Sequence, residues 1–180
     1  MNLEKGKILI HFFFINIILV VGTIGCNLNG LDPSFQTEPT IEFNCIPSPQ
    51  ENQTATVISV IDGDTIKIKM NNQNVSVRYI GINAPEFDSD ERRLAEEAMQ
   101  YNAELVNNQT VTLYWDISDT DRFGRLLRYV FVGEIFVNYE LVRLGFARQR
   151  DYPPDSACKD LFIKAQEEAI AMRRGIWKSH

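Results

Sequence analysis

The sequence predicts a mainly β fold of the α+β class: a five-stranded OB-type barrel with about three α-helices. Two observations predict it. Five short segments are rich in β-branched residues, alternate apolar with polar side chains, and are separated by turn residues. Three other segments repeat apolar residues at helical spacing, and the first of these follows the third strand. With 44% hydrophobic residues in 180, the chain can form one sizeable core, so we expect one domain plus terminal extras.

The first three strands are expected in a meander. Thr54–Ile61 and Thr65–Met70 alternate and are β-branched. Asn71–Asn74 is a turn, and Val75–Ile82 is the third strand.

A helix is expected next, because Ser89 or Asp90 can cap it and acidic residues occupy its first turn. Asn107 and Asn108 end it. Its apolar face is expected to combine four residues at i, i+4, i+7 and i+11: Leu94, Ala98, Tyr101 and Leu105.

The remaining chain supplies two strands and two helices. Thr110–Trp115 and Leu126–Val132 are strands separated by the polar loop 116–125. A short helix over 137–144 ends at Gly145. The last helix begins near Ser156, ends at Gly175, and is expected to bury four side chains: Phe162, Ala165, Ala169 and Met172.

The N-terminus predicts export. Residues 1–25 are typical of a signal peptide, with Lys5 and Lys7 before an apolar run. Cys26 follows a small residue at the end of that run, which is typical of a lipidated cysteine; an ordinary cleaved signal and an uncleaved anchor are the alternatives. We therefore expect a lipoprotein anchored in the bacterial cell envelope, or a secreted protein. Residues 26–50 would include the lipidated cysteine and a flexible tether, and residues 51–180 would form the domain.

Two further cysteines remain, Cys45 and Cys158. In an exported protein they can form a disulfide, and two free thiols are the alternative. A zinc site is not supported, because there is no CxxC and the two histidines, His11 and His180, lie at the ends of the chain.

The charge excludes a broad nucleic-acid footprint. The chain has 18 basic and 24 acidic residues, a net charge of −6; loss of Lys5, Lys7 and Glu4 with the leader leaves 16 and 23, a net of −7. Binding to a phosphate backbone would need a local arginine site aided by a cation.

Carboxylates and an amide lie at the predicted strand ends. Asp62-Gly63-Asp64 is a hairpin turn by itself, but two carboxylates beside a flexible glycine can also bind a cation. Pro85 biases Ala84 towards extended geometry, which can aim the Ala84 carbonyl and the Asn83 side chain at the same ion. Glu86 is placed to orient or deprotonate a water, or is a solvated loop acid.

Two arginines are candidates for a phosphodiester site. Arg78 lies inside a predicted strand, where arginine is uncommon unless paired; an outward-facing arginine is the alternative. Arg125 follows Gly124 and has the same two interpretations. Tyr152, in a proline-rich loop, is a candidate for stacking on a base.

Three motifs together resemble the staphylococcal nuclease family, and two further segments, Leu141–Ala147 and Gly175–Trp177, extend the resemblance to about residues 54–178. The motifs are Ile61-Asp62-Gly63-Asp64-Thr65, then Arg78 with Asn83-Ala84-Pro85-Glu86, then Asp121-Arg122-Phe123-Gly124-Arg125.

The resemblance implies an OB-fold enzyme that hydrolyses DNA and RNA with calcium and leaves 3′-phosphate and 5′-hydroxyl ends. It implies that Asp64, Asn83 and the Ala84 carbonyl are calcium ligands, with Asp62 and Thr65 supporting them. It implies that Glu86 is the general base or orients the water. Arg78 and Arg125 would bind the phosphate and stabilise the transition state.

The sequence departs from the family at two positions. Asn83 is a neutral amide where the family has a second metal carboxylate, so we expect weaker calcium binding. Phe123 replaces a common tyrosine, which removes a phenolic contact to the phosphate and keeps a ring that can stack on the substrate.

The sequence therefore predicts an exported, calcium-dependent endonuclease, expected to act as a monomer. One alternative is an OB-fold nucleic-acid-binding lipoprotein that has lost catalysis. A surface adhesin is a second alternative, and it has no need for Arg78, Glu86 and Arg125 together.

Overall fold

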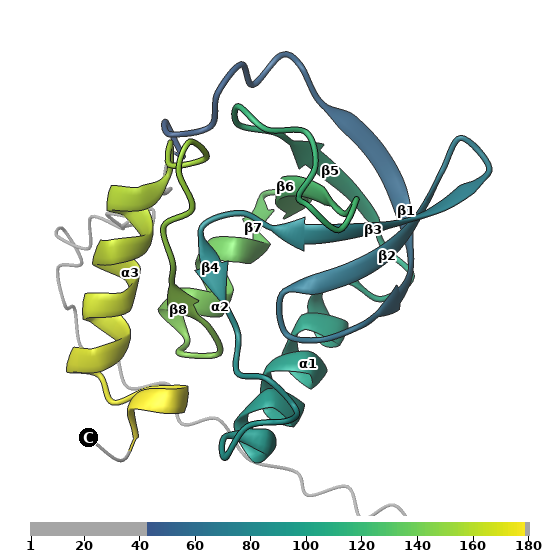
Figure 1. Ribbon diagram of the computed structural model, residues 1–180. Helices are drawn as coiled ribbons and strands as arrows, with labels where there is room; N and C mark the ends of the chain where they lie inside the picture. Colours follow the sequence, from purple (N-terminus) through teal and green to yellow (C-terminus); the bar gives the residue numbers. More distant parts are fainter. Residues whose placement is uncertain (1–42, 179–180) are drawn as a thin grey trace, which may run out of the picture. The chain divides into compact units, whose positions relative to one another are not determined.

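The computed structural model describes residues 43–178, which form a closed five-stranded barrel with helices around it (Figure 1). The barrel strands are β1 (Gln53–Val60), β2 (Thr65–Met70), β3 (Gln73–Tyr79), β5 (Thr110–Tyr114) and β6 (Leu126–Val132). Their order is β3-β2-β1-β5-β6, with antiparallel neighbours. A parallel pairing of β3 with β6 closes the barrel. The short strand β7 (Ile135–Phe136) pairs antiparallel with the end of β6.

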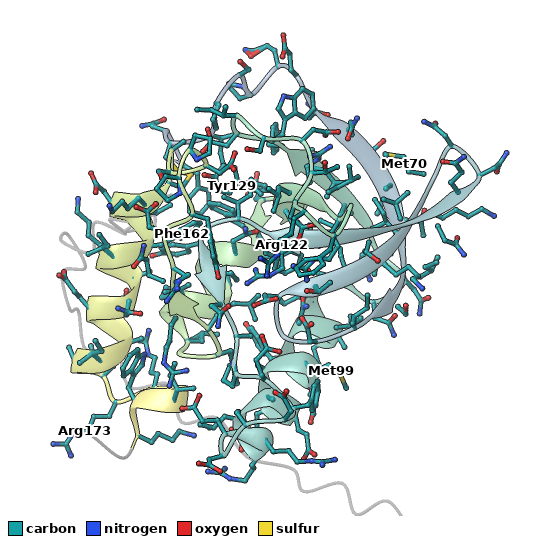
Figure 2. The ribbon with its side chains drawn as sticks, in the orientation of Figure 1. Met70, Met99, Arg122, Tyr129, Phe162 and Arg173 are labelled. Atoms are coloured by element: carbon teal, nitrogen blue, oxygen red, sulfur yellow. A yellow bond between two sulfur atoms is a disulfide. The ribbon has the colours of Figure 1, made fainter. Side chains whose placement is uncertain are left out.

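Three helices cover the barrel, as the sequence predicts, and a short 3-10 turn follows them. They are α1 (Arg92–Val106), α2 (Val137–Arg143), α3 (Lys159–Ala171) and η1 (Gly175–Trp177). α1 packs against β1, α2 against β6, and α3 against α2. Phe162 of α3 lies 6.3 Å from Tyr129 of β6 between ring centroids, so the core continues from the barrel to α3 (Figure 2).

The expected third strand, 75–82, is interrupted. β3 ends at Tyr79, and the chain turns at Gly81, where φ is +79° and a Cβ would lie 2.5 Å from the Phe162 ring. The chain then enters β4 (Ile82–Asn83), which pairs with β8 (Arg148–Gln149) in a second small sheet. Gly81 therefore redirects the chain, and the redirected segment carries Asn83 towards the loop that follows β8.

Ala98 of the apolar face predicted for α1 is buried as expected, Tyr101 and Leu105 are partly buried against the core, and the other most buried positions lie one residue later than predicted. The most buried positions are Ala95, Ala98, Asn102 and Val106. Asn102 is buried because it accepts a hydrogen bond from the Tyr79 hydroxyl and donates one to the Asp62 carbonyl. The helix begins one residue after the predicted caps, with Glu91 at the N-cap position and no side-chain cap.

The prediction that α3 buries Met172 is wrong. The helix ends at Ala171, the chain reverses at Arg173 with φ of +51°, and Met172 is 63% exposed. The start of α3 also lies later than expected, at Lys159 with Cys158 as its N-cap.

Part of the segment that the sequence assigned to the tether, residues 43–46, lies against the domain. Phe43 packs its ring edge-on against Phe136 at 5.0 Å between centroids. Cys45 is joined to Cys158 by a disulfide, with Cα atoms 5.0 Å apart. Phe43, Cys45 and Ile46 are apolar, and all three pack against the core.

The signal peptide 1–25, the lipidation candidate Cys26 and the tether up to residue 42 lie outside the described residues. None of the helices between residues 43 and 178 has the length and apolar character needed to cross a bilayer.

Candidate active site

The closure of the barrel brings the predicted site residues together. Arg78 lies opposite Thr65 of β2 on one side and opposite Leu127 of β6 on the other. The residue before Thr65 is Asp64, and the loop that enters β6 carries Arg125. Segments about 60 residues apart therefore meet across three neighbouring strands.

These residues open on one cleft of about 740 Å³. The predicted site residues on its lining are Asp62, Asp64, Arg78, Asn83, Glu86, Phe123, Arg125 and Tyr152. The other two predicted residues, Thr65 and Ala84, hydrogen-bond to Asp64. The Thr65 hydroxyl donates to Asp64 Oδ1 at 3.1 Å, and the Ala84 backbone N–H donates to Asp64 Oδ2 at 2.7 Å.

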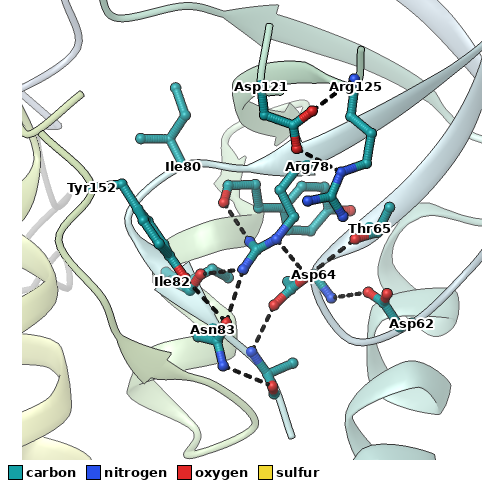
Figure 3. A network of polar contacts seen from close by, with 12 residues as sticks. Asp62, Asp64, Thr65, Arg78, Ile80, Ile82, Asn83, Asp121, Arg125 and Tyr152 are labelled. Atoms are coloured by element: carbon teal, nitrogen blue, oxygen red, sulfur yellow. Dashed lines mark hydrogen bonds and ion pairs between the residues drawn. The ribbon is translucent and has the colours of Figure 1, made fainter. Parts of the chain in front are cut away.

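Asp64 is a buried carboxylate, only 4% exposed. Its Oδ1 pairs with Arg78 Nε at 3.1 Å, and its backbone N–H donates to Asp62 Oδ1 at 2.9 Å (Figure 3). Burial raises the pKa of the Asp64 carboxyl to about 7; the charge of Arg78 opposes this rise, and that of Asp62 adds to it.

Gly63 lets Asp62 and Asp64 approach the helix. A Cβ at Gly63 would lie 2.6 Å from the Ala84 Cβ and 2.8 Å from the Ala98 Cβ. The glycine is therefore needed for space, because any side chain would push Ala84 and α1 away from the turn.

Arg78 is paired and buried, in agreement with the first of its two interpretations. Besides Asp64, its guanidinium donates to the Tyr79 carbonyl at 2.7 Å, the Ile82 carbonyl at 2.9 Å and Asn83 Oδ1 at 3.1 Å. Four of its five N–H groups therefore already have protein acceptors. Its charge reaches the cleft, but it is not a free fork for a phosphate.

Asn83 faces Arg78 rather than open space. Its Oδ1 accepts from Arg78 and lies 3.3 Å from the Tyr152 hydroxyl, while its Nδ2 donates to the Ala84 carbonyl at 3.2 Å (Figure 3). Turning the amide over would place Nδ2–H against an Arg78 N–H, so Arg78 fixes the orientation. An N–H consequently covers the Ala84 carbonyl.

Arg125 is held differently, by its own loop. The Asp121 carboxylate accepts from Arg125 Nε at 2.7 Å and from the backbone N–H groups of Arg125 and Phe123. Partial burial of Asp121 is outweighed by these hydrogen bonds, which lower its pKa. The two terminal nitrogens of Arg125 have no hydrogen-bond partner within residues 43–178, and Figure 3 shows them directed towards the ion pair of Asp64 and Arg78.

Exposed groups complete the cleft. Glu86 follows β4 on the lining and its side chain is exposed. Phe123 is 69% exposed, with the guanidinium of Arg122 at 4.7 Å and that of Arg125 at 5.5 Å from its ring centroid. On the other side, Tyr152 lies 6.0 Å from the Arg78 guanidinium. Both predicted stacking residues therefore lie at the cleft beside arginines.

The donors fit a calcium ion in kind. The carboxylates of Asp62 and Asp64 and the carbonyl of Ala84 are hard oxygens, and calcium completes its coordination with water. The Nδ2 of Asn83 weakens the set, because it offers a donor where an oxygen is needed. In the described part of the chain, no three His, Cys, Asp or Glu side chains are grouped closely enough to hold a metal by themselves.

Sequence reasoning missed three groups that shape the cleft. Asp155 is 4% exposed and accepts from the N–H groups of Ile117 and Ser118 at 3.0 and 2.7 Å, which ties the two cleft loops together. Arg122, an ordinary surface arginine by sequence, lines the cleft. Arg128 is buried behind the loop. Its position in the alternating strand Leu126–Val132 was the available signal, the same one that identified Arg78.

Comparison with known proteins gives consistent matches. The family model described as "Staphylococcal nuclease homologue" matches residues 76–179. A thermonuclease of Staphylococcus hyicus is 33% identical over 135 residues, which cover 73% of this chain and 80% of that protein. A thermonuclease of Staphylococcus intermedius is 35% identical over 66% of this chain and 73% of its own length. Endonuclease YncB of Bacillus subtilis is 31% identical over 95% of this chain and 92% of its length.

Proposed function

The chain belongs to the staphylococcal nuclease family, and we propose that it is a calcium-dependent endonuclease that hydrolyses DNA and RNA to 3′-phosphate ends. The names of its relatives, thermonuclease and endonuclease, support a hydrolase that cleaves phosphodiester bonds. One observation carries the proposal: the Asp64–Arg78 pair, Glu86 and Arg125 line a single cleft.

Arg125 is the group that binds the scissile phosphate. Asp121 holds its Nε, so the guanidinium is oriented while its terminal nitrogens stay available for two phosphate oxygens. Preorganised donors of this kind stabilise charge that develops on the oxygens in the transition state, and removing one typically costs roughly 3–4 kcal/mol.

Glu86 accepts the proton of the attacking water. Its carboxylate is exposed on the lining, where a water can reach it. General-base assistance of this kind typically contributes about 10²–10⁴-fold in rate.

Arg78 acts mainly as a fixed charge. Its bonds to two carbonyls and to Asp64 hold it at the base of the cleft, and one N–H on Nη1 remains for a substrate oxygen. A calcium ion bound by Asp62, Asp64 and the Ala84 carbonyl would supply Lewis-acid polarisation of the phosphate at the same place.

The test is a cleavage assay with the purified protein on single-stranded DNA, duplex DNA and RNA. We expect cleavage with added Ca²⁺, arrest by a chelator, and 3′-phosphate ends on the products. Glu86→Gln is the matched control, because it keeps the size and polarity of the side chain and removes the base. A preparation in which Glu86→Gln cleaves as fast as the wild type would contradict the proposed role of Glu86.

Binding without cleavage would support the second candidate, a nucleic-acid-binding OB-fold. The observation that favours it is the Asn83 N–H covering the Ala84 carbonyl, since that contact competes with a cation. An oligonucleotide that binds with unchanged affinity in the presence of chelator, and is never cut, would establish this alternative.

The proposed location is the bacterial cell envelope, through a lipid on Cys26. This proposal rests on residues 1–26 of the sequence. Fractionation of cells that express the wild type and Cys26→Ala tests it. Anchoring predicts that the variant leaves the membrane fraction, and equal distribution of both proteins would contradict it.

A further inference from the structure

Arg128 is the most deeply buried arginine among the described residues, at 1% exposure, and lies directly behind the cleft loop. Its Nη1 donates to the Asp119 carbonyl at 2.9 Å and the Leu127 carbonyl at 2.7 Å. Its Nη2 donates to Asp119 Oδ1 at 2.6 Å and to Gln53 Oε1 at 3.3 Å. One guanidinium therefore bonds to both the backbone and the side chain of Asp119.

Burying the Arg128 side chain is energetically unfavourable in one respect. Its Nε is buried and has no hydrogen-bond partner in the part of the chain that the structure describes. An unsatisfied buried donor is unfavourable, and an apolar side chain against Trp115, whose ring centroid lies 5.5 Å away, would avoid that cost. The bonds to Asp119 are what an apolar residue would lose.

Asp119 begins the loop segment that presents Arg125. The Leu127 N–H donates to the Asp119 carbonyl at 2.9 Å, and the Asp121 N–H donates to the Arg125 carbonyl at 2.9 Å. The segment 119–125 is thus a closed turn whose base is held by Arg128. Asp155 anchors residues 117 and 118, so the contacts of Arg128 are the next anchor along the chain.

We propose that Arg128 is a positioning residue for phosphate binding: by clamping Asp119 it keeps the segment 119–125 in the conformation that directs Arg125 into the cleft. This inference rests on the proposed function of the cleft. Arg128 touches no substrate and acts through Asp119 and Arg125. When the clamp is weakened, the loop samples other conformations, and the apparent affinity for substrate falls by the competent fraction.

Two variants test the clamp. Arg128→Lys keeps the charge, but three N–H groups on one nitrogen cannot replace the four bonds that Nη1 and Nη2 make. Asp119→Ala removes only a carboxylate whose side chain is 73% exposed, so the variant is expected to fold. The matched control is Arg143→Lys, which breaks a comparable two-bond arginine–carboxylate pair with Glu140 on α2.

The first measurement is amide hydrogen exchange, which does not depend on activity. In Arg128→Lys we expect exchange across residues 119–127 to be about tenfold faster, while exchange in α1 and α3 stays at the wild-type rate. In Asp119→Ala the acceleration is smaller, about two- to fivefold, because an exposed ion pair contributes up to about 1 kcal/mol. Arg143→Lys should leave this segment unchanged.

The second measurement is the kinetics of oligonucleotide cleavage. Arg128→Lys should raise KM about tenfold and leave kcat within about twofold, because saturating substrate selects the competent loop. A merely structural role would instead lower the active fraction, so kcat would fall at constant KM. Wild-type exchange across 119–127 together with wild-type KM would overturn the clamp while leaving the proposed function intact. A wild-type chain that cuts nothing would overturn the proposed function, and the exchange measurement would then decide the clamp alone.

Discussion

The two sides of the cleft are built in opposite ways. The side formed by β2 and β3 is buried: Asp64 and Arg78 are 4% and 8% exposed, and nearly every polar atom of the pair has a protein partner. The side formed by the loop 116–125 is open: Phe123 is 69% exposed, and the terminal nitrogens of Arg125 point into the cleft.

The pKa shifts of Asp64 and Asp121 show how the two sides differ in their effect on folding stability. Burial raises the pKa of Asp64, so its charged form opposes folding at neutral pH. Burial also acts on Asp121, but hydrogen bonds from Arg125 and Phe123 outweigh it and lower the pKa, so its charged form favours folding. The charged form of Asp64 therefore lowers the stability of the buried side, whereas the hydrogen bonds of Asp121 stabilise the loop side.

The largest expected effect is at Arg78. Arg78→Ala should lower kcat/KM by about 10²–10³-fold. It should also lower the free energy of unfolding by about 3–5 kcal/mol, because it leaves the buried Asp64 carboxylate without its partner. Cleavage kinetics and urea denaturation measure the two effects. Arg78→Lys is the control for charge alone, and a fully stable Arg78→Ala protein would show that the stability of the buried side does not depend on the ion pair.

Arg125→Ala should lose activity without losing stability. The rate should fall by about 10²–10³-fold, because two donors to the phosphate are gone. The free energy of unfolding should change by less than about 1 kcal/mol, since the Arg125 side chain is 31% exposed and pairs within its own loop. A loss of stability as large as that of Arg78→Ala would remove the contrast between the two sides.

For the buried side, the sequence predicted which residues take part but not how the chain places them. Alternation gave the five strands, and an arginine inside one of them marked Arg78. The break at Gly81 was not visible, because the reason for it is the Phe162 ring, about 80 residues away. The bonds of Arg78 to the Tyr79 and Ile82 carbonyls depend on that break, so the sequence indicated a paired arginine but not these acceptors.

The loop side was predicted by motif rather than by periodicity. Phe123 and Arg125 stand out beside Gly124, but the anchors of the loop do not. Asp155 contacts the loop from a segment more than 30 residues away, and Arg128 contacts it from the strand that follows, through bonds to Asp119 that depend on how the loop folds back. The contact of Asp155 leaves no periodic signal in a single sequence, whereas the place of Arg128 inside an alternating strand was the one signal available.

Opposite pH dependence of stability is expected at Asp64 and Asp121. The pKa of Asp64 rises from 3.8 to about 7 on folding, so the folded state holds more protons between these values and stability falls as pH rises through that window. Asp64→Asn should remove this slope, so its stability relative to the wild type should rise between about pH 4 and pH 7, while activity is lost.

Asp121→Asn is the matched control for Asp64→Asn. The folded pKa of Asp121 is lowered, so its contribution is present above the unfolded pKa and is lost as pH falls through the folded value. Asp121→Asn should therefore be less stable than the wild type at pH 8. Urea midpoints of both variants and the wild type, measured from about pH 2 to pH 8, cover both windows. The stability of Asp64→Asn relative to the wild type should rise with pH and that of Asp121→Asn should fall, so changes in the same direction would contradict the comparison.

The smallest expected effect is at Asn83, which bonds to Arg78 of the buried side and to the Ala84 carbonyl. In Asn83→Asp one carboxylate oxygen can keep the bond to Arg78, and the other replaces the N–H that now covers the Ala84 carbonyl. Two oxygens would then face one another and favour a cation between them, so we expect calcium to bind about tenfold more tightly.

Calcium titration by calorimetry measures the affinity, and the rise in melting temperature with calcium gives a second readout. Asn74→Asp, on the exposed hairpin of β3, adds the same charge away from the cleft and should leave the affinity unchanged. If Asn83→Asp bound calcium no more tightly than that control, the amide would not be what limits the ion, and the buried pair of Asp64 and Arg78 would be the remaining cause.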